Sequence, residues 1–79
     1  MIDKLKFLEV VKLIFEETPD ENINFETVFK NLQEWDSLIA LSLIVTIEDN
    51  FSILITPSII ENSKTIEELY LSINSNYAN

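Results

Sequence analysis

The sequence predicts an all-α fold, a four-helix bundle with a long first loop and a short third helix. Apolar residues recur at steps of three and four along the longer segments, which is the period of an amphipathic helix. Proline and capping residues separate these segments, so we expect helices near residues 2–17, 37–50, 57–62 and 65–75. Because 79 residues allow only one small core, we expect a single domain over residues 1–79, with a frayed polar tail at 74–79.

A stripe of apolar side chains predicts the first helix, at residues 2–17. The stripe consists of Phe7, Leu8, Val11, Ile14 and Phe15. Thr18 and Pro19 should end the helix, because proline disfavours helical geometry in the residue before it. We interpret the carboxylates at this end as solvated charge rather than as a Ca²⁺ or Mg²⁺ site; they are Glu16, Glu17, Asp20 and Glu21.

Residues 18–36 form a long connection, which needs apolar anchors because a structureless loop of this length is unusual in a compact domain. The expected anchors are Ile23, Phe25, Val28, Phe29 and Leu32. Asn24 can cap a short helical turn here, with Glu26 in its first turn. Trp35 either packs over the start of the second helix or contacts a partner, and we expect mainly packing.

The second helix, at residues 37–50, is predicted to begin at Ser37 with Asp36 as its N-cap. With about 100° between successive residues, its expected core face consists of Ala40, Leu43, Ile44, Ile47 and Phe51. A separate apolar strip flanks Ser37 and consists of Leu38, Leu41 and Val45. This strip is a partner surface, a wall for a hydrophobic ligand, or a second face buried by the domain itself.

A buried strand is the alternative for part of this segment, because residues 43–47 are rich in β-branched side chains. The uninterrupted length from Ser37 to Asn50 exceeds that of a usual strand and favours the helix. Asn50 and Ser52 stand where glycine commonly ends a helix, and Asn tolerates left-handed geometry better than most residues.

Two pairs of residues predict the starts of the last two helices. Thr56 is the expected N-cap of the third helix, and Pro57 suits its first helical position because no N–H is needed there. Thr65 and Glu68 form a capping box for the fourth helix. The residues expected to face the core are Ile59, Ile60, Ile66, Leu69, Tyr70 and Ile73.

Ser37 is the candidate site of a covalent modification. The first turn of a helix has unpaired N–H groups and partial positive charge, so a phosphate esterified to Ser37 lies where anions are favoured. The alternative is that Asp36 and Ser37 only cap the helix.

The composition excludes many kinds of active site. Without His, Cys or Arg the chain cannot form a catalytic triad, a zinc site with nitrogen or sulfur ligands, or a guanidinium clamp for phosphate. Without Gly it has no P-loop or dinucleotide-binding motif. We expect no metal site and no catalytic residues.

The net charge of −9 disfavours nucleic acid and anionic membranes and favours partners with basic patches. The alternative is that the charge serves only solubility. The longest uncharged apolar run is too short to cross a bilayer, and Asp3, Lys4 and Lys6 interrupt any signal-peptide pattern. We therefore expect a cytoplasmic protein, as a monomer.

Several motifs follow one another in register along the chain. They are Asp36-Ser37-Leu38, the apolar helix, the acidic pair Glu48-Asp49, Phe51-Ser52-Ile53, Ile59-Ile60 and Thr65-Ile66-Glu67-Glu68-Leu69. On these residues the chain resembles the acyl carrier protein family from Leu5 to Ile73, with Ser52 where that family usually has Gly. Trp35 before the motif resembles stand-alone carriers outside the main fatty-acid pathway.

The resemblance implies a bundle of the acyl-carrier type in which Ser37, between Asp36 and Leu38, carries 4′-phosphopantetheine through a phosphodiester. It implies a carrier and not an enzyme, with a role in fatty-acid or polyketide biosynthesis. The implied partners are a phosphopantetheinyl transferase, which modifies the serine, and acyl-activating and acyl-transfer enzymes. The second and third helices would form the mouth of a cavity for the acyl chain.

The chain departs from well-known fatty-acid carriers after the motif, where apolar residues and Ser42 replace acidic ones. We therefore expect hydrophobic packing to contribute more to docking than ion pairs do. The expected partner-binding residues are Trp35, Leu38, Ile39, Leu41, Val45, Glu48, Asp49, Ile60 and Glu61.

Three other functions stay open at this point. An aminoacyl or peptidyl carrier would use the same cofactor with a different load. An unmodified helical interaction protein would take no cofactor at all. A small hydrolase would have to work with carboxylates, lysine, tyrosine and hydroxyls alone.

Overall fold

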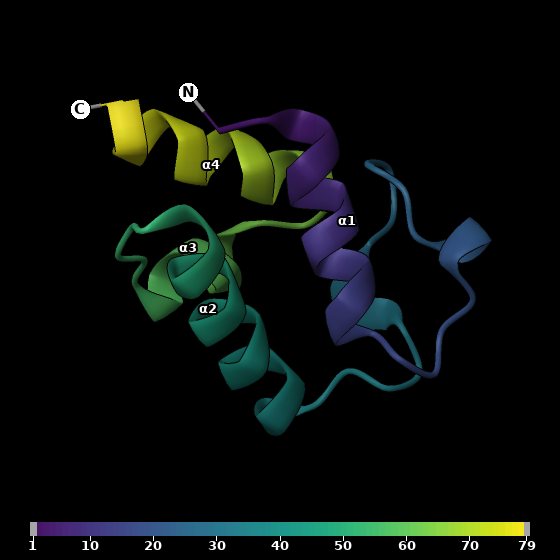
Figure 1. Ribbon diagram of the computed structural model, residues 1–79. Helices are drawn as coiled ribbons and strands as arrows, with labels where there is room; N and C mark the ends of the chain where they lie inside the picture. The colour runs from purple at the N-terminus through teal and green to yellow at the C-terminus, as the bar shows by residue number, and fades with distance from the viewer. Residues whose placement is uncertain (1, 79) are drawn as a thin grey trace.

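Four α-helices surround one core in the computed structural model, which describes the backbone of residues 2–78 and the side chains of residues 2–75. The helices are α1 (Lys4–Ile14), α2 (Ser37–Phe51), α3 (Pro57–Asn62) and α4 (Ile66–Ala78), and two 3₁₀ turns, η1 (Asp20–Asn22) and η2 (Phe29–Asn31), lie in the first connection. Figure 1 shows α1 beside α2, with α4 across the bundle, and the short α3 packs against α4. The all-α prediction is confirmed for the described residues. None of these helices has both the length and the apolar character needed to cross a membrane.

Helix α1 is shorter at both ends than predicted. The Asp3 side chain caps it by accepting a hydrogen bond from the Lys6 N–H at 3.0 Å. The helix ends at Ile14, three residues before the predicted end, because Phe15 leaves helical geometry (φ −90°, ψ 72°) and inserts its ring into the core. Val10, which the predicted stripe left out, is buried as well.

The long connection is anchored as expected, and its backbone also caps α4. Ile23 and Phe29 are buried, whereas the other three expected anchors are half-buried. Asn24 caps a single turn, as predicted: its side chain accepts the Glu26 N–H at 2.9 Å, and its carbonyl accepts the Thr27 N–H at 3.1 Å. The first N–H groups of α4 donate to the carbonyls of Phe25 and Thr27, which satisfies donors that have no partner within the helix.

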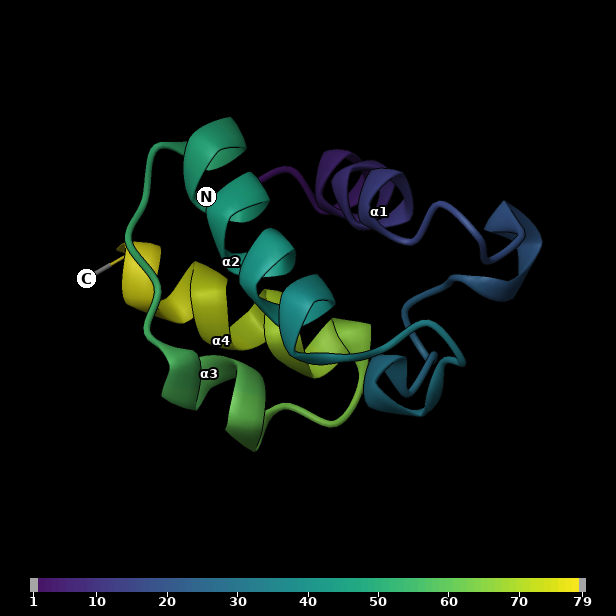
Figure 2. The same ribbon diagram turned by 90° about the horizontal axis from the view of Figure 1, so that it is seen from below.

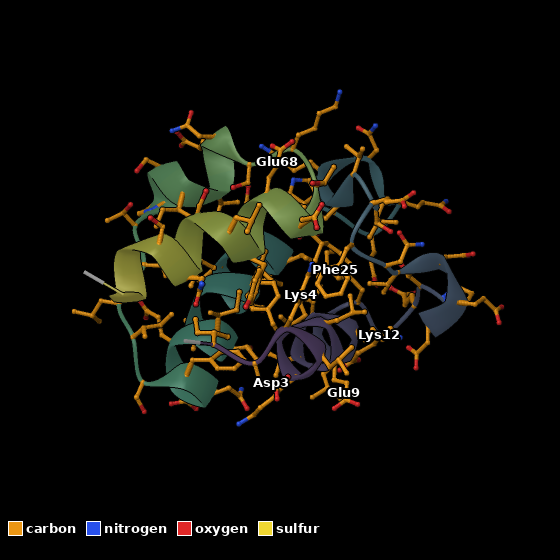
Figure 3. The ribbon with its side chains drawn as sticks, turned by 90° about the horizontal axis from the view of Figure 1, so that it is seen from above. Asp3, Lys4, Glu9, Lys12, Phe25 and Glu68 are labelled. Atoms are coloured by element: carbon orange, nitrogen blue, oxygen red, sulfur yellow. The ribbon has the colours of Figure 1, made fainter. Side chains whose placement is uncertain are left out.

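Lys4 joins the start of α1 to this connection and to α4. Its ammonium group pairs with the Glu67 carboxylate at 3.1 Å and lies 4.7 Å from the centre of the Phe25 ring. Figure 3 shows Lys4 beside Phe25 between α1 and α4. The pair is half-exposed, so the contact positions the elements more than it stabilises them.

The core face of α2 is buried as predicted, and its end differs in one detail. Leu43 and Ile47 are fully buried, and Ala40, Ile44 and Phe51 are half-buried. The left-handed residue that ends the helix is Ser52 (φ 54°), whereas Asn50 stays helical and donates its side-chain amide to the Thr46 carbonyl at 2.8 Å.

Helix α3 has the predicted bounds and begins with Pro57 at its first helical position. Thr56 occupies the cap position without a capping hydrogen bond; its hydroxyl pairs with that of Ser58 at 2.8 Å. At the start of α4 the Thr65 hydroxyl accepts the Glu68 N–H at 3.1 Å, as predicted. The Glu68 carboxylate accepts the N–H of Lys64 at 2.8 Å rather than that of Thr65, so the predicted capping box forms only in part.

Helix α4 continues through Ala78, three residues beyond the predicted end at residue 75, and residue 79 lies outside the described residues. Contacts with the N-terminal segment hold this part of the helix. The Asn74 side chain accepts the Ile2 N–H at 2.9 Å, and the buried Tyr70 hydroxyl donates to the Ile2 carbonyl at 2.6 Å. Contacts between segments so far apart in the chain leave no pattern in the local sequence, so the sequence around residues 70–78 could not predict them.

Candidate functional site

Ser37 is exposed and is the first residue of α2. Asp36 fixes this start: its Oδ1 accepts the Ile39 N–H at 2.8 Å, and its carbonyl accepts the Ala40 N–H at 3.0 Å. Within the described residues the Ser37 hydroxyl has no hydrogen-bond partner. Figure 2 shows the first connection entering this end of α2. The predicted cap and the exposure of Ser37 are both confirmed.

The helix end around Ser37 suits an anionic substituent. The cap occupies the N–H of Ile39, whereas the N–H groups of Ser37 and Leu38 have no carbonyl to pair with inside the helix. The 15 residues of α2 contribute partial positive charge at this end. An exposed hydroxyl at such a position fits a phosphodiester, because the phosphate meets unpaired N–H donors and no neighbouring side chain covers it.

Trp35 packs against the core, as expected from the sequence. Its ring stacks on Phe15 with 6.3 Å between ring centroids and meets Phe29 edge to face at 5.3 Å. The side chain is half-buried, so part of it still reaches the surface next to the site. Packing of this kind holds the segment that leads into α2.

Glu34 is a functional candidate that the sequence analysis did not identify. Its carboxylate accepts the Glu17 N–H and the Thr18 hydroxyl, each at 3.0 Å. Its partners lie 17 and 16 residues earlier in the chain, so no local pattern signals them.

The apolar strip on α2 is exposed. Leu38, Leu41 and Val45 are 70%, 57% and 53% exposed, and Ile39 is half-buried beside them. Exposure on this scale excludes the alternative in which the domain buries the strip itself. The strip begins next to Ser37 and continues along α2 for two turns.

The other expected partner-binding residues divide between surface and interior. Asp49 and Glu61 are exposed. Glu48 is half-buried, and its carboxylate accepts the Ile55 N–H at 3.0 Å, so it holds the turn after α2. Ile60 is only 5% exposed and packs in the core, so little of its side chain is available to a partner in this conformation.

A small cavity of about 330 Å³ lies between α2 and α3. It is lined by Lys30, Trp35, Ala40, Ile44, Pro57, Ile60 and Glu61. The Lys30 ammonium group donates to the carbonyls of Ile60 and Glu61, at 3.0 and 2.9 Å, and so ties the last turn of α3 to the first connection. The walls are mostly apolar side chains, which suits a hydrophobic ligand.

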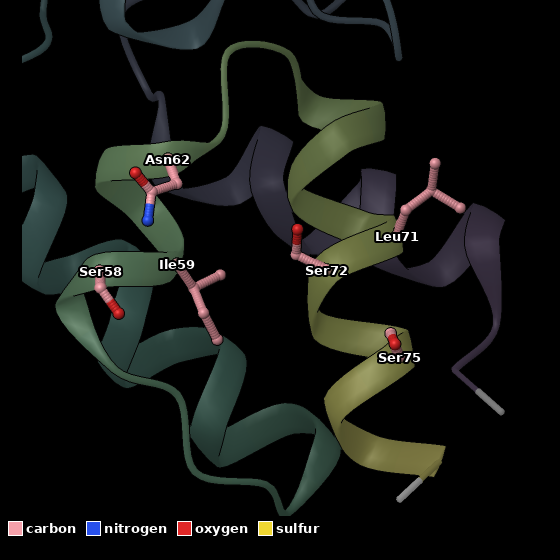
Figure 4. A pocket seen from close by; sticks show the side chains of 6 residues that line it. All are labelled: Ser58, Ile59, Asn62, Leu71, Ser72 and Ser75. Carbon is pink, nitrogen blue, oxygen red and sulfur yellow. The ribbon is translucent and has the colours of Figure 1, made fainter.

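A second groove, of about 440 Å³, separates α3 from α4. Figure 4 shows its lining, with Ile59 of α3 and Ser72 of α4 pointing into the space between the helices and Leu71 pointing away. The lining of this groove contains no charged side chain. Nowhere in the described part of the chain do three or more His, Cys, Asp or Glu residues come together in a metal-binding arrangement.

Two comparisons with known proteins bear on this site. A family model described as "Phosphopantetheine attachment site" matches residues 6–73. The chain is also 32% identical over 78 residues to a protein named "Acyl carrier protein" from Phytoplasma australiense, and the match covers 99% of each chain. No solved structure matches. The chain therefore belongs to the acyl carrier protein family, and its cofactor is 4′-phosphopantetheine.

Proposed function

We propose that Ser37 carries the 4′-phosphopantetheine and that the protein delivers an acyl group between biosynthetic enzymes. The observation that carries the proposal is the exposed hydroxyl at the capped N-terminus of α2. When bound, the cofactor supplies a thiol that holds the acyl group as a thioester. The protein itself supplies the attachment point and the docking surface, and catalysis belongs to its partners.

Loading of the cofactor is a reaction of the Ser37 oxygen. This oxygen forms a bond to the phosphorus that bears the pantetheine arm of coenzyme A, the phosphoanhydride bond breaks, and the nucleotide part of coenzyme A leaves. The hydroxyl proton passes to a base of the phosphopantetheinyl transferase. The first-turn N–H groups and the positive end of α2 favour the new phosphodiester.

Intact-mass measurement tests the proposal. After incubation with coenzyme A and a phosphopantetheinyl transferase, the chain should gain the mass of one phosphopantetheine, and the Ser37→Ala variant should gain nothing. Ser58→Ala is the matched control, because Ser58 is exposed in the first turn of another helix. Modification that persists in Ser37→Ala, or that is lost in Ser58→Ala, would contradict the assignment of the site.

We propose that an acyl chain lies with its apolar end in the cavity between α2 and α3. Ala40, Ile44 and Ile60 supply apolar walls. Partners are proposed to dock on the strip formed by Leu38, Leu41 and Val45, since an enzyme that acts on a group at Ser37 must cover the adjacent surface of α2. The exposed carboxylates nearby, such as Asp49 and Glu61, favour partners with basic residues at the rim.

An aminoacyl or peptidyl load is the second candidate function, and the apolar strip on α2 supports it equally well. The loading enzyme determines which kind of group is attached, and the mass added beyond that of the cofactor identifies the group.

One core joins all four helices, which supports a single domain. The absence of cysteine and the net charge of −9 support a monomer in the cytoplasm.

A further inference from the structure

We infer that Glu34 is a positioning residue for the modification of Ser37: it clamps the segment 34–38 to the turn that follows α1. The inference rests on the proposed function, because it concerns the loading of the same serine. Glu34 itself lies three residues before the reacting hydroxyl and acts through the backbone of the segment.

The clamp uses both oxygens of the carboxylate. Oε1 accepts the Thr18 hydroxyl and Oε2 accepts the Glu17 N–H, each at 3.0 Å. A carboxylate held at two points is fixed in orientation as well as in position, and hydrogen bonds to a charged acceptor are stronger than neutral ones. The anchoring turn is itself closed, because the Thr18 N–H donates to the Phe15 carbonyl at 3.2 Å.

The next residue attaches to the same turn through its ring. The Trp35 ring stacks on the buried ring of Phe15. The backbone N–H of Trp35 donates to the Leu32 carbonyl at 3.0 Å. Glu34 through its carboxylate and Trp35 through its ring therefore both contact the same short stretch, residues 15–18.

The third residue is fixed by the helix. Asp36 caps α2 through the Ile39 N–H at 2.8 Å. Three consecutive residues before Ser37 are thus held by three different contacts, while Ser37 itself is exposed. The side chains of residues 34–36 serve the protein's own structure and leave the hydroxyl of residue 37 accessible to an enzyme.

A preformed segment reduces the ordering that the transferase must impose. The enzyme has to bring the Ser37 oxygen in line with a phosphorus atom, and freedom in residues 34–36 would have to be removed on binding. Loss of the clamp should therefore raise the transferase KM for the carrier more than it lowers kcat. If Glu34 instead made a direct ionic contact with the transferase, its effect would depend on its charge. Variants that remove the charge but keep the hydrogen bonds therefore distinguish the clamp from a direct ionic contact.

Three variants separate them in transferase kinetics. Glu34→Ala removes both bonds of the clamp, whereas Thr18→Val removes the bond to Oε1 and leaves the Glu17 N–H bond in place. Each should lower kcat/KM by about three- to tenfold, the change that corresponds to the loss of one typical hydrogen bond, and Thr18→Val should lie at the lower end. Glu34→Gln removes the charge but keeps the clamp, because the amide oxygen accepts the Glu17 N–H and the amide nitrogen donates to the Thr18 hydroxyl. It should stay within about twofold of the wild type. Glu21→Ala is the matched control, since it removes an exposed carboxylate from the same connection.

Hydrogen exchange supplies a readout that a general loss of stability would not reproduce. In Glu34→Ala, exchange should accelerate in residues 15–18 and 34–38 and stay unchanged in α4. The inference is overturned if Glu34→Gln is as impaired as Glu34→Ala while Thr18→Val is normal, or if all three variants are loaded like the wild type. A wild-type chain that takes no cofactor overturns the proposed function instead.

Discussion

The N-cap of α2 offers a quantitative test of how the site is built. In Asp36→Ala the Ile39 N–H loses the acceptor that now lies 2.8 Å away. Replacing an N-cap of this kind by Ala costs about 1 kcal/mol, within a range of roughly 0.5–2 kcal/mol. Asn caps a helix as well as Asp does, so Asp36→Asn should lose only the interaction of its charge with the helix end, a few tenths of a kcal/mol for an exposed group.

Thermal unfolding followed by circular dichroism measures this difference. For a domain of this size about 1 kcal/mol lowers Tm by roughly 4–8 °C, so Asp36→Ala should melt several degrees below the wild type. Asp36→Asn should melt close to the wild type, and its small deficit should shrink further at high salt. If Asp36→Ala melts with the wild type, or if Asp36→Asn is equally destabilised, the capping bond does not determine where α2 begins.

Three further changes test other parts of the fold and of the proposed surface. Tyr70→Phe removes the buried hydroxyl that donates to the Ile2 carbonyl, and urea unfolding should show a loss of about 1 kcal/mol. Lys30→Met keeps the aliphatic stem but removes both donors to the end of α3, so hydrogen exchange should accelerate in residues 57–62. Leu41→Asp should abolish partner binding without loss of helix content, because Leu41 is exposed, and unchanged binding would refute the apolar docking surface.

Local signals predicted the elements that position the site. Asp36 marked the start of α2 and Pro57 the start of α3, and both helices begin where these residues place them. Each signal acts within one helical turn, so it is present in the sequence itself. The ends of α1 and α4 depend instead on distant partners: Phe15 turns inward to meet Trp35, and Asn74 binds the backbone of Ile2. Sequence periodicity alone therefore placed these ends incorrectly.

The same division applies to the candidate site. Helical geometry was enough to predict the apolar strip on α2, because angles around one helix follow from residue numbers. It was not enough for the charged side chains, whose roles depend on what the fold brings near them. Glu34 and Glu48 both accept hydrogen bonds from the protein's own backbone, and Ile60 lies in the core. An acidic residue next to a motif is thus weak evidence for partner docking until its own hydrogen bonds are known.

Charge and apolar surface have different effects in the proposed docking. A net charge of −9 acts across about a Debye length, roughly 8 Å at physiological salt, and raises the rate of encounter with any basic surface. It distinguishes poorly between partners that all carry lysine and arginine. Leu38, Leu41 and Val45 act only on contact, where the shape of the facing surface decides how much of them is buried. On this surface, selectivity should therefore lie in the dissociation rate and persist at salt concentrations that slow association.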